Sequence, residues 1–123
     1  MSTTDFFTAK QTPAKLEHID DEACRRFQGS IEFVGKRWSS GILLAITRGH
    51  TRFSEIVAAV PGLSDRLLSQ RVKELEHEGV LERIVIPTTP VQISYQLTER
   101  GSDLMKALEG VAEWGQRWND TPK

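Results

Sequence analysis

The chain has 123 residues, of which 38% are hydrophobic and 27% are charged, as is typical of one folded domain. Its single cysteine excludes an internal disulfide and a metal site built from several cysteines. The N-terminal residues lack the apolar run of a secretion signal, and no stretch approaches membrane-spanning length, so we expect a cytoplasmic protein.

The charge of the chain is unevenly distributed. The formal net charge is −1, which alone argues against a general nucleic-acid binder. Between Lys36 and Lys73, however, seven basic residues accompany two acidic ones, which gives this segment a local charge of +5. The other segments together carry nine basic and fifteen acidic residues. A positive surface on a nearly neutral protein indicates that this segment binds phosphate.

The first expected element is a polar arm. Residues 1–20 show no periodicity and contain Pro13, so we interpret them as a flexible or dimer-docked N-terminal arm. Phe6 and Phe7 are exceptions in this arm, and either packing on a second subunit or disorder would account for them. Residues 21–120 are expected to form the folded domain.

The spacing of apolar residues, together with caps and glycines, predicts the helices of this domain. Asp20 or Asp21 caps the first, and Ser64 caps the fourth. Two runs rich in β-branched residues flank a Pro-Thr-Thr-Pro segment, which predicts a hairpin with its tip at the prolines. The predicted helices are about 21–34, 39–47, 53–60, 64–78 and 98–118, and the predicted strands are 80–86 and 91–97. This order predicts an α+β, mainly α fold: a winged helix-turn-helix with a two-stranded wing and additional helices at both ends.

The predicted helix 64–78 has two different faces. Leu68, Val72 and Leu75 recur at i, i+4 and i+7, as expected of a face buried in the core. The opposite face is basic and polar, and such side chains can donate to guanine or phosphate or pair with adenine. Recognition helices contact bases mainly through their N-terminal half. We therefore expect the bases to be contacted by Arg66, Ser69, Gln70 and Lys73.

Contacts to the DNA backbone are expected around this helix, from basic residues and from helix N-termini. The predicted wing carries Arg83 as its single cation. A weak wing contact and a purely structural wing therefore both remain open. The candidate backbone contacts are Lys36, Arg37, Arg48, Arg52, Ser64, Thr88 and Thr89.

Short motifs in a fixed order extend from Cys24 to about Trp118. They are Gly35-Lys36-Arg37-Trp38, Arg52-Phe53-Ser54-Glu55-Ile56, Pro61-Gly62-Leu63-Ser64, Leu68-Ser69-Gln70-Arg71-Val72-Lys73-Glu74-Leu75, Tyr95-Gln96-Leu97-Thr98 and Glu113-Trp114-Gly115. In these motifs the chain resembles the HxlR family of bacterial winged-helix transcriptional regulators. It departs from the family where Lys36 replaces the second glycine of Gly-Gly-Lys-Trp and where Arg25 replaces the proline of Cys-Pro.

The resemblance implies a homodimer, joined through the N-terminal region and the C-terminal helix. It also implies that the dimer binds double-stranded operator DNA with inverted or direct repeats and represses or activates nearby genes. The sequence independently places two tryptophans at i, i+4 near the chain end, an apolar surface larger than one small core needs. The alternative is that both tryptophans pack on their own core. The expected dimer-interface residues are Phe27, Leu108, Val111, Trp114 and Trp118.

The resemblance also suggests a role for Cys24, because some relatives sense electrophiles or oxidants through a cysteine at this position. Arg25 and Arg26 would favour the reactive thiolate if their guanidinium groups lay near the sulfur. The alternative is an inert cysteine packed beside apolar residues of its helix. A small-molecule effector, bound between the dimer helices and the DNA-binding core, is a further candidate signal.

Two other classes of function compete with DNA binding. An enzyme is not expected, because His18, His50 and His77 are dispersed and the chain has neither a glycine-rich phosphate loop nor paired metal ligands. We accordingly expect no cofactor and no metal. The stronger alternative is a winged-helix protein–protein interaction module without sequence-specific DNA binding. The basic, polar face of helix 64–78 favours DNA, and a steep salt dependence of binding would distinguish the two.

Overall fold

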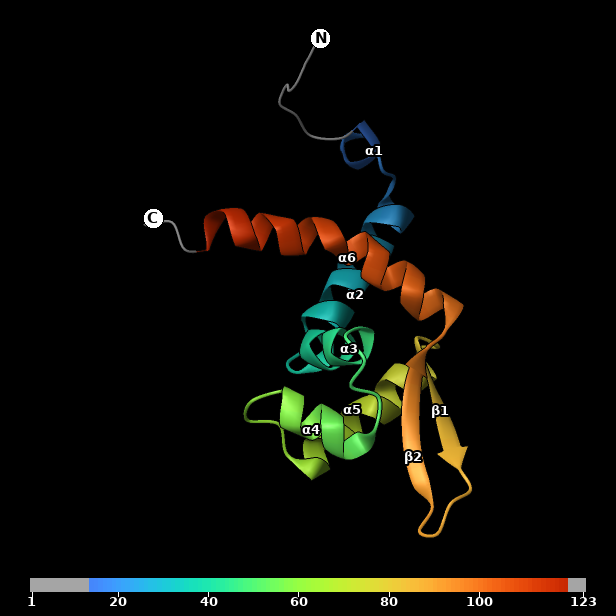
Figure 1. Ribbon diagram of the computed structural model, residues 1–123. Coiled ribbons are helices and arrows are strands. Elements are labelled where there is room, and N and C mark those ends of the chain that lie inside the picture. The colour runs from blue at the N-terminus through green and yellow to red at the C-terminus, as the bar shows by residue number, and fades with distance from the viewer. Residues whose placement is uncertain (1–13, 120–123) are drawn as a thin grey trace. The chain divides into compact units, whose positions relative to one another are not determined.

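The computed structural model describes residues 14–119, and this part of the chain forms six helices and one two-stranded antiparallel sheet (Figure 1). The order of the elements confirms the predicted mainly helical winged helix-turn-helix. The elements are α1 Ala14–Glu17, α2 Asp21–Gly35, α3 Ser39–Thr47, α4 Phe53–Ala59, α5 Asp65–His77, β1 Leu81–Ile86, β2 Gln92–Leu97 and α6 Glu99–Trp118.

The chain divides into two compact units, and the division falls between Gly35 and Lys36. The first unit contains α1 and α2. The short helix α1 lies within residues 1–20, the segment that the sequence predicts to be a flexible or dimer-docked arm. The predicted domain boundary after residue 20 stays a prediction, and Phe6 and Phe7 lie outside the described residues.

Helix α2 begins as predicted from its acidic cap. The side chain of Asp20 accepts a hydrogen bond from the backbone N–H of Ala23 at 2.8 Å. Such a bond satisfies one of the amide groups that a helix leaves free at its start. None of the residues of α2 is buried, and Phe27 and Ile31 are about half exposed.

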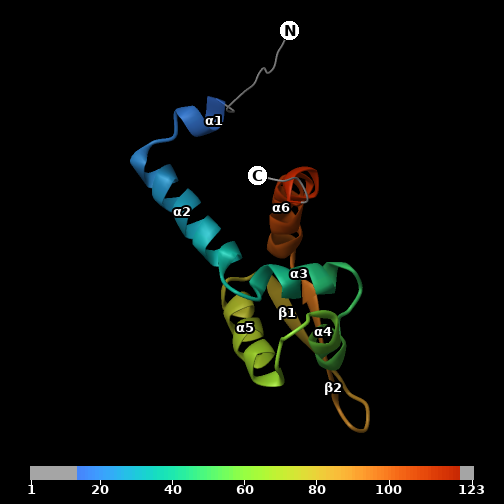
Figure 2. The same cartoon turned by 90° about the vertical axis from the view of Figure 1, so that its left-hand side faces the viewer.

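The core of the second unit lies among α3, α4, α5 and the hairpin. Figures 1 and 2 show α4 and α5 on one side of α3, with the hairpin projecting alongside them. Helical spacing in the sequence predicts that Phe53, Ile56 and Val57 of α4 are all buried. In the structure Ile56 is buried, whereas Phe53 and Val57 stay partly exposed, so α4 contributes less to the core than predicted. Phe53 lines an open groove between α5 and the hairpin. The fully buried large side chains are Ile42, Leu43, Ile56, Leu68 and Leu75.

The hairpin is anchored to the helices at its base. Strands β1 and β2 pair from Leu81 opposite Leu97 to Ile86 opposite Gln92. The segment just before α4 adds to this sheet, because the backbone N–H of Tyr95 donates to the carbonyl of Thr51 at 2.8 Å. This bond ties the start of α4 to β2, and the tip of the hairpin is left to project from the helices.

The start of α6 is joined to the end of α5 by a short network around Thr98. The Thr98 hydroxyl donates to the carbonyl of Gly79 at 2.5 Å and accepts from the N–H of Gly101 at 3.0 Å. The N–H of Thr98 donates to the carbonyl of Val80 at 3.1 Å. A Cβ on Gly101 would lie 2.1 Å from that same carbonyl oxygen. Only glycine therefore fits here without moving the backbone.

We predict that Gly101→Ala lowers the free energy of unfolding by about 1–3 kcal/mol, as overpacking of a tight contact does. The matched control is Gly110→Ala on the same helix, where an added Cβ would meet nothing within 4 Å. The control should be neutral or stabilising by up to about 1 kcal/mol, since alanine favours helix. Urea unfolding of the two variants measures both effects. Equal stabilities would contradict the steric argument.

Candidate nucleic-acid interface

Helix α5 separates its residues into a core face and an outer face, as the sequence predicted. Leu68, Val72 and Leu75 are at most 2% exposed and fix the helix on the core. The opposite side is exposed along the whole helix. This outer face consists of Arg66, Ser69, Gln70, Lys73 and His77. The structure therefore brings the four predicted base-contacting residues onto one accessible surface.

The turn that introduces α5 is supported by an aromatic ring. Ser64 caps the helix as predicted, its side chain accepting from the N–H of Leu67 at 3.1 Å. Gly62 has φ 86°, and a Cβ there would lie 3.1 Å from the ring of Trp38. Trp38 itself has φ 79°, a left-handed conformation that costs a residue with a side chain about 1–3 kcal/mol. The ring of Trp38 thus fixes the turn that sets the start of α5.

Arg52 stands at the start of α4, where its side chain is exposed and its backbone N–H is held by the Glu55 carboxylate. The Glu55 carboxylate accepts hydrogen bonds from the N–H groups of Thr51 and Arg52 at 3.2 and 3.1 Å. The bond from Arg52 is the main reason that the pKa of Glu55 lies below its ordinary value. Desolvation opposes this effect, and the Thr51 bond and the charges of Arg52 and His50 add to it. The exposed Arg52 side chain is available for a phosphate contact.

Two other predicted phosphate contacts, Lys36 and Arg37, already have partners within the protein. The Lys36 ammonium lies 3.2 Å from the carboxylate of Glu74 on α5. The Arg37 guanidinium lies over the ring of Trp38, 4.7 Å from its centroid. In the sequence, Arg71 stands out only as one of the positive charges between Lys36 and Lys73. In the structure its side chain is largely buried and donates to the Arg37 carbonyl and to Glu74. The pairing of Lys36 with Glu74 was missed because these two residues lie 38 positions apart in the sequence.

The hairpin tip offers little charge. Thr88 and Thr89 are exposed there, as expected of wing residues that meet DNA. The Thr88 hydroxyl, however, donates to the carbonyl of Pro90 at 2.8 Å and so stabilises the turn. The structure therefore leaves the role of the wing in DNA contact as a prediction.

The groove between α5 and the hairpin has a volume of about 640 Å³ and is lined by residues of both. Ser69 and Lys73 of the outer face stand on its α5 wall. Tyr95 lies in the same groove. Burial is the main cause of its raised pKa, and the charge of Glu76 adds to it, while Arg83 opposes the shift. The side of α5 that faces the hairpin is therefore accessible from the groove.

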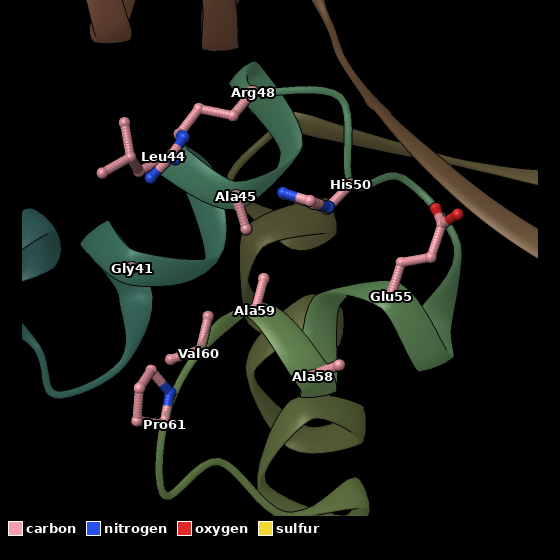
Figure 3. Close-up of a pocket in the computed structure, with 10 residues that line it drawn as sticks. All are labelled: Gly41, Leu44, Ala45, Arg48, His50, Glu55, Ala58, Ala59, Val60 and Pro61. Atoms are coloured by element: carbon pink, nitrogen blue, oxygen red, sulfur yellow. The ribbon is translucent and has the colours of Figure 1, made fainter.

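Arg48 lies apart from the outer face of α5. Figure 3 shows it with His50 at one end of a hollow between α3 and α4, with α5 passing behind α4. The hollow has a volume of about 480 Å³, and its floor is formed by apolar residues such as Leu44 and Ala59. No residue of α5 lines it. The predicted phosphate contact of Arg48 therefore stays a prediction.

The predicted dimer-interface and sensor residues are divided between the two units of the chain. In the second unit, Val111, Trp114 and Trp118 of α6 are 55–61% exposed, and Leu108 is partly exposed. In the first unit, Cys24 of α2 is a free, partly buried thiol. Arg26 pairs with Glu22 one turn earlier on α2, so part of the charge expected to assist the thiol is occupied.

The part of the chain that the structure describes contains neither a metal-binding cluster nor a membrane-spanning helix. Residues 14–119 contain no group of three or more His, Cys, Asp or Glu side chains that could hold a metal ion. Within the same range, no helix is long and apolar enough to cross a membrane.

A helix with a basic and polar outer face, carried on a winged-helix scaffold, defines a DNA-binding regulator of the winged helix-turn-helix class. Residues 33–123 match the family model described as HxlR-like helix-turn-helix. The chain belongs to this family of transcriptional regulators. The predicted family and regulatory function are thus confirmed, and the comparisons give no support to a protein-interaction module.

The similar proteins are regulators as well. YvaP of Bacillus subtilis, an uncharacterized HTH-type transcriptional regulator, is 48% identical over 99 residues, which cover 80% of this chain and 92% of YvaP. YodB of the same organism is 35% identical over 95 residues, which cover 77% of this chain and 85% of YodB. Both relatives are described as HTH-type transcriptional regulators.

The solved structures agree with this assignment. The reduced form of YodB matches with a TM-score of 0.71 and 33% identity, covering 81% of this chain and 98% of the YodB chain. The redox regulator HypR in its reduced form matches with a TM-score of 0.72 and 27% identity, covering 77% of this chain and 94% of that chain. YodB treated with diamide and HypR in its oxidised form are also similar.

We predict that Glu55→Gln lowers the melting temperature at about pH 7 and has less effect at about pH 3. Because the pKa of Glu55 is lowered in the folded state, its carboxylate stabilises the fold at pH values above the pKa that Glu55 has in the unfolded chain. That stability is lost as the pH falls through the lowered pKa of the folded state. Thermal unfolding followed by circular dichroism measures the difference. Glu109→Gln, at an exposed position of α6, is the matched control and should show no such dependence on pH.

Proposed function

We propose that the protein regulates transcription as a homodimer that binds an operator with two half-sites, inserting α5 into the major groove of each. The observation that carries this proposal is the accessible outer face of α5, opposite Leu68, Val72 and Leu75. Arg66, Ser69, Gln70 and Lys73 supply the donors and acceptors that base edges require. We expect the regulator to act in the cytoplasm, where the operator DNA is accessible.

Backbone contacts from residues around α5 would fix its register on the duplex. Arg52 is the best supported of them, because its side chain is exposed while its backbone bridges to Ser94 of β2. Ser64, Thr88 and Thr89 are also exposed, at the start of α5 and at the hairpin tip. Arg37 and Arg48 remain candidates whose side chains are exposed but lie off the outer face of α5.

The proposed dimer rests on the exposed apolar surface of α6. Val111, Trp114 and Trp118 would otherwise leave a contiguous apolar surface in water, which monomeric proteins rarely do. Leu108 on α6 and Phe27 on α2 are further candidates for the interface. Two α5 helices about 34–36 Å apart would enter successive major grooves on one face of the duplex. Both inverted and direct repeats remain candidate operator designs.

We predict that Arg66→Ala weakens binding to the operator by about 1–3 kcal/mol, the value of a lost bidentate contact to guanine. Fluorescence anisotropy with DNA from upstream of the gene, or with a site selected in vitro, measures the affinity. Lys106→Ala removes the same charge from an exposed position of α6 and serves as the control. An unchanged affinity of Arg66→Ala would remove this residue from the base-contacting set.

We further propose that the regulator responds to oxidants or electrophiles through Cys24. The similarity to YodB and to the redox regulator HypR supports a response of this kind. Cys24 is the single thiol of the chain and is partly accessible. A small-molecule effector is the alternative signal.

We predict that diamide weakens operator binding by the unmodified protein, that an added thiol restores it, and that Cys24→Ser abolishes the response. The physical reason is that Cys24 carries the single thiol of the chain, so it is the side chain that diamide would oxidise. Binding is measured with and without diamide on the same operator. If Cys24→Ser retained the full response, the sensor role would be excluded and a bound effector would be sought instead.

A further inference from the structure

Arg71 and Glu74 lie on a flank of α5 that belongs neither to its core face nor to its outer face. At 100° per residue, this flank is turned away from Ser69 and Glu76, which line the groove beside the hairpin. The hairpin therefore borders one side of α5, and Arg71 and Glu74 occupy the other. Contacts on this second flank restrain the rotation of α5 about its own axis.

The contacts on this flank join α5 to the segment that precedes α3. Arg71 Nε donates to the carbonyl of Arg37 at 3.2 Å, and its Nη1 donates to Glu74 Oε1 at 3.3 Å. Lys36 Nζ donates to Glu74 Oε2 at 3.2 Å. The Arg71 side chain is only 16% exposed, so this cation faces the protein rather than solvent. We call Lys36, Arg71, Glu74 and the Arg37 carbonyl the α5 clamp.

The clamp also changes the electrostatics of the DNA-binding surface. On the helix, Glu74 is next to Gln70 of the outer face, so its carboxylate stands at the edge of the surface that would meet DNA. An unpaired negative charge at this edge would repel phosphate. Lys36 and Arg71 offset it with two positive charges. Both cations are therefore occupied by Glu74 rather than free for DNA.

We propose that Lys36 and Arg71 are positioning residues for operator binding, acting through Glu74 and the Arg37 carbonyl, and that neither contacts phosphate. This assignment replaces the phosphate contact that the sequence predicted for Lys36. It rests on the proposed function, in which α5 binds DNA.

The dependence of affinity on salt distinguishes a positioning residue from a phosphate contact. Each phosphate that a cation neutralises contributes about 0.9 to the slope of log affinity against log salt. Loss of a phosphate contact lowers both the affinity and this slope. Loss of a residue that orients α5 lowers the affinity and changes this slope by well under about 0.9.

The experiment measures operator affinity at several salt concentrations for Lys36→Met and Arg71→Met, each alone and combined with Glu74→Gln. We expect Lys36→Met to weaken binding about two- to threefold, as for an exposed ion pair, and Arg71→Met about tenfold, since it removes bonds to a charged group. Either substitution alone leaves Glu74 less well neutralised and should lower the slope by well under about 0.9, and neither should change the slope when Glu74→Gln is present. Lys36→Met should cause no further loss when Glu74→Gln is present, and Lys36→Arg should keep full affinity. Arg52→Met, which removes the best supported backbone contact, is the control and should lower the slope by about 0.9.

A slope lowered by about 0.9 in Lys36→Met or Arg71→Met would overturn the proposal, as would a Lys36→Met effect that persists with Glu74→Gln. Circular dichroism shows whether each variant folds. If Arg71→Met fails to fold, Lys36→Met still tests the proposal, because Lys36 is exposed and its replacement leaves the core intact. The proposed function is judged separately, on the unmodified protein. If that protein shows no salt-dependent binding to duplex DNA, the proposed function fails and the clamp assignment fails with it.

Discussion

The close approach of Gly101 to the carbonyl of Val80 is the constraint on which the second unit depends. The end of α5, the start of β1 and the start of α6 meet there, with no room for a Cβ. Thr98 reinforces the contact, because its hydroxyl binds the Gly79 carbonyl on one side and the Gly101 N–H on the other. The helix proposed to enter DNA and the helix proposed to form the dimer are therefore fixed to one backbone junction.

The other end of α5 is set by contacts of a different kind. The ring of Trp38 packs on Gly62 at the turn before α5, and Arg71 holds the middle of the helix to the Arg37 carbonyl. The three consecutive residues Lys36, Arg37 and Trp38 thus all contribute to the position or the surroundings of α5. The same three residues follow directly after α2. The position of α5 therefore depends on this short segment as well as on the hydrophobic core.

Local features of the fold could be predicted from the sequence because their causes are local. Ser64 caps α5, Gly79 ends it with φ 79°, and the prolines mark the hairpin tip, each through neighbours a few positions away. The outer face of α5 followed from helical periodicity alone. The buried contribution of α4 was overestimated, because periodicity shows which residues share a face and not how completely another element covers it.

Long-range partners could not be predicted in the same way. The sequence marks Lys36 as a cation beside a basic segment, which suggests phosphate, but its pairing with Glu74 depends on how α5 packs. The left-handed backbone of Trp38 likewise has no signal in the residue type, since tryptophan rarely adopts it. Charge patterning therefore marked the candidate DNA-binding region, whereas the partners that its cations have within the protein required the structure.

The hairpin is attached to the start of α4 near its base and not at its tip. The attachment consists of the hydrogen bond from the Tyr95 N–H to the carbonyl of Thr51 and of the adjacent bridge between Arg52 and Ser94. The tip at Thr88 and Thr89 lies at the far end of both strands. A sideways force on the tip would be transmitted as a torque on the start of α4. A displacement of the hairpin would thereby also displace the start of α4, where Arg52 stands, even though the tip itself carries little charge.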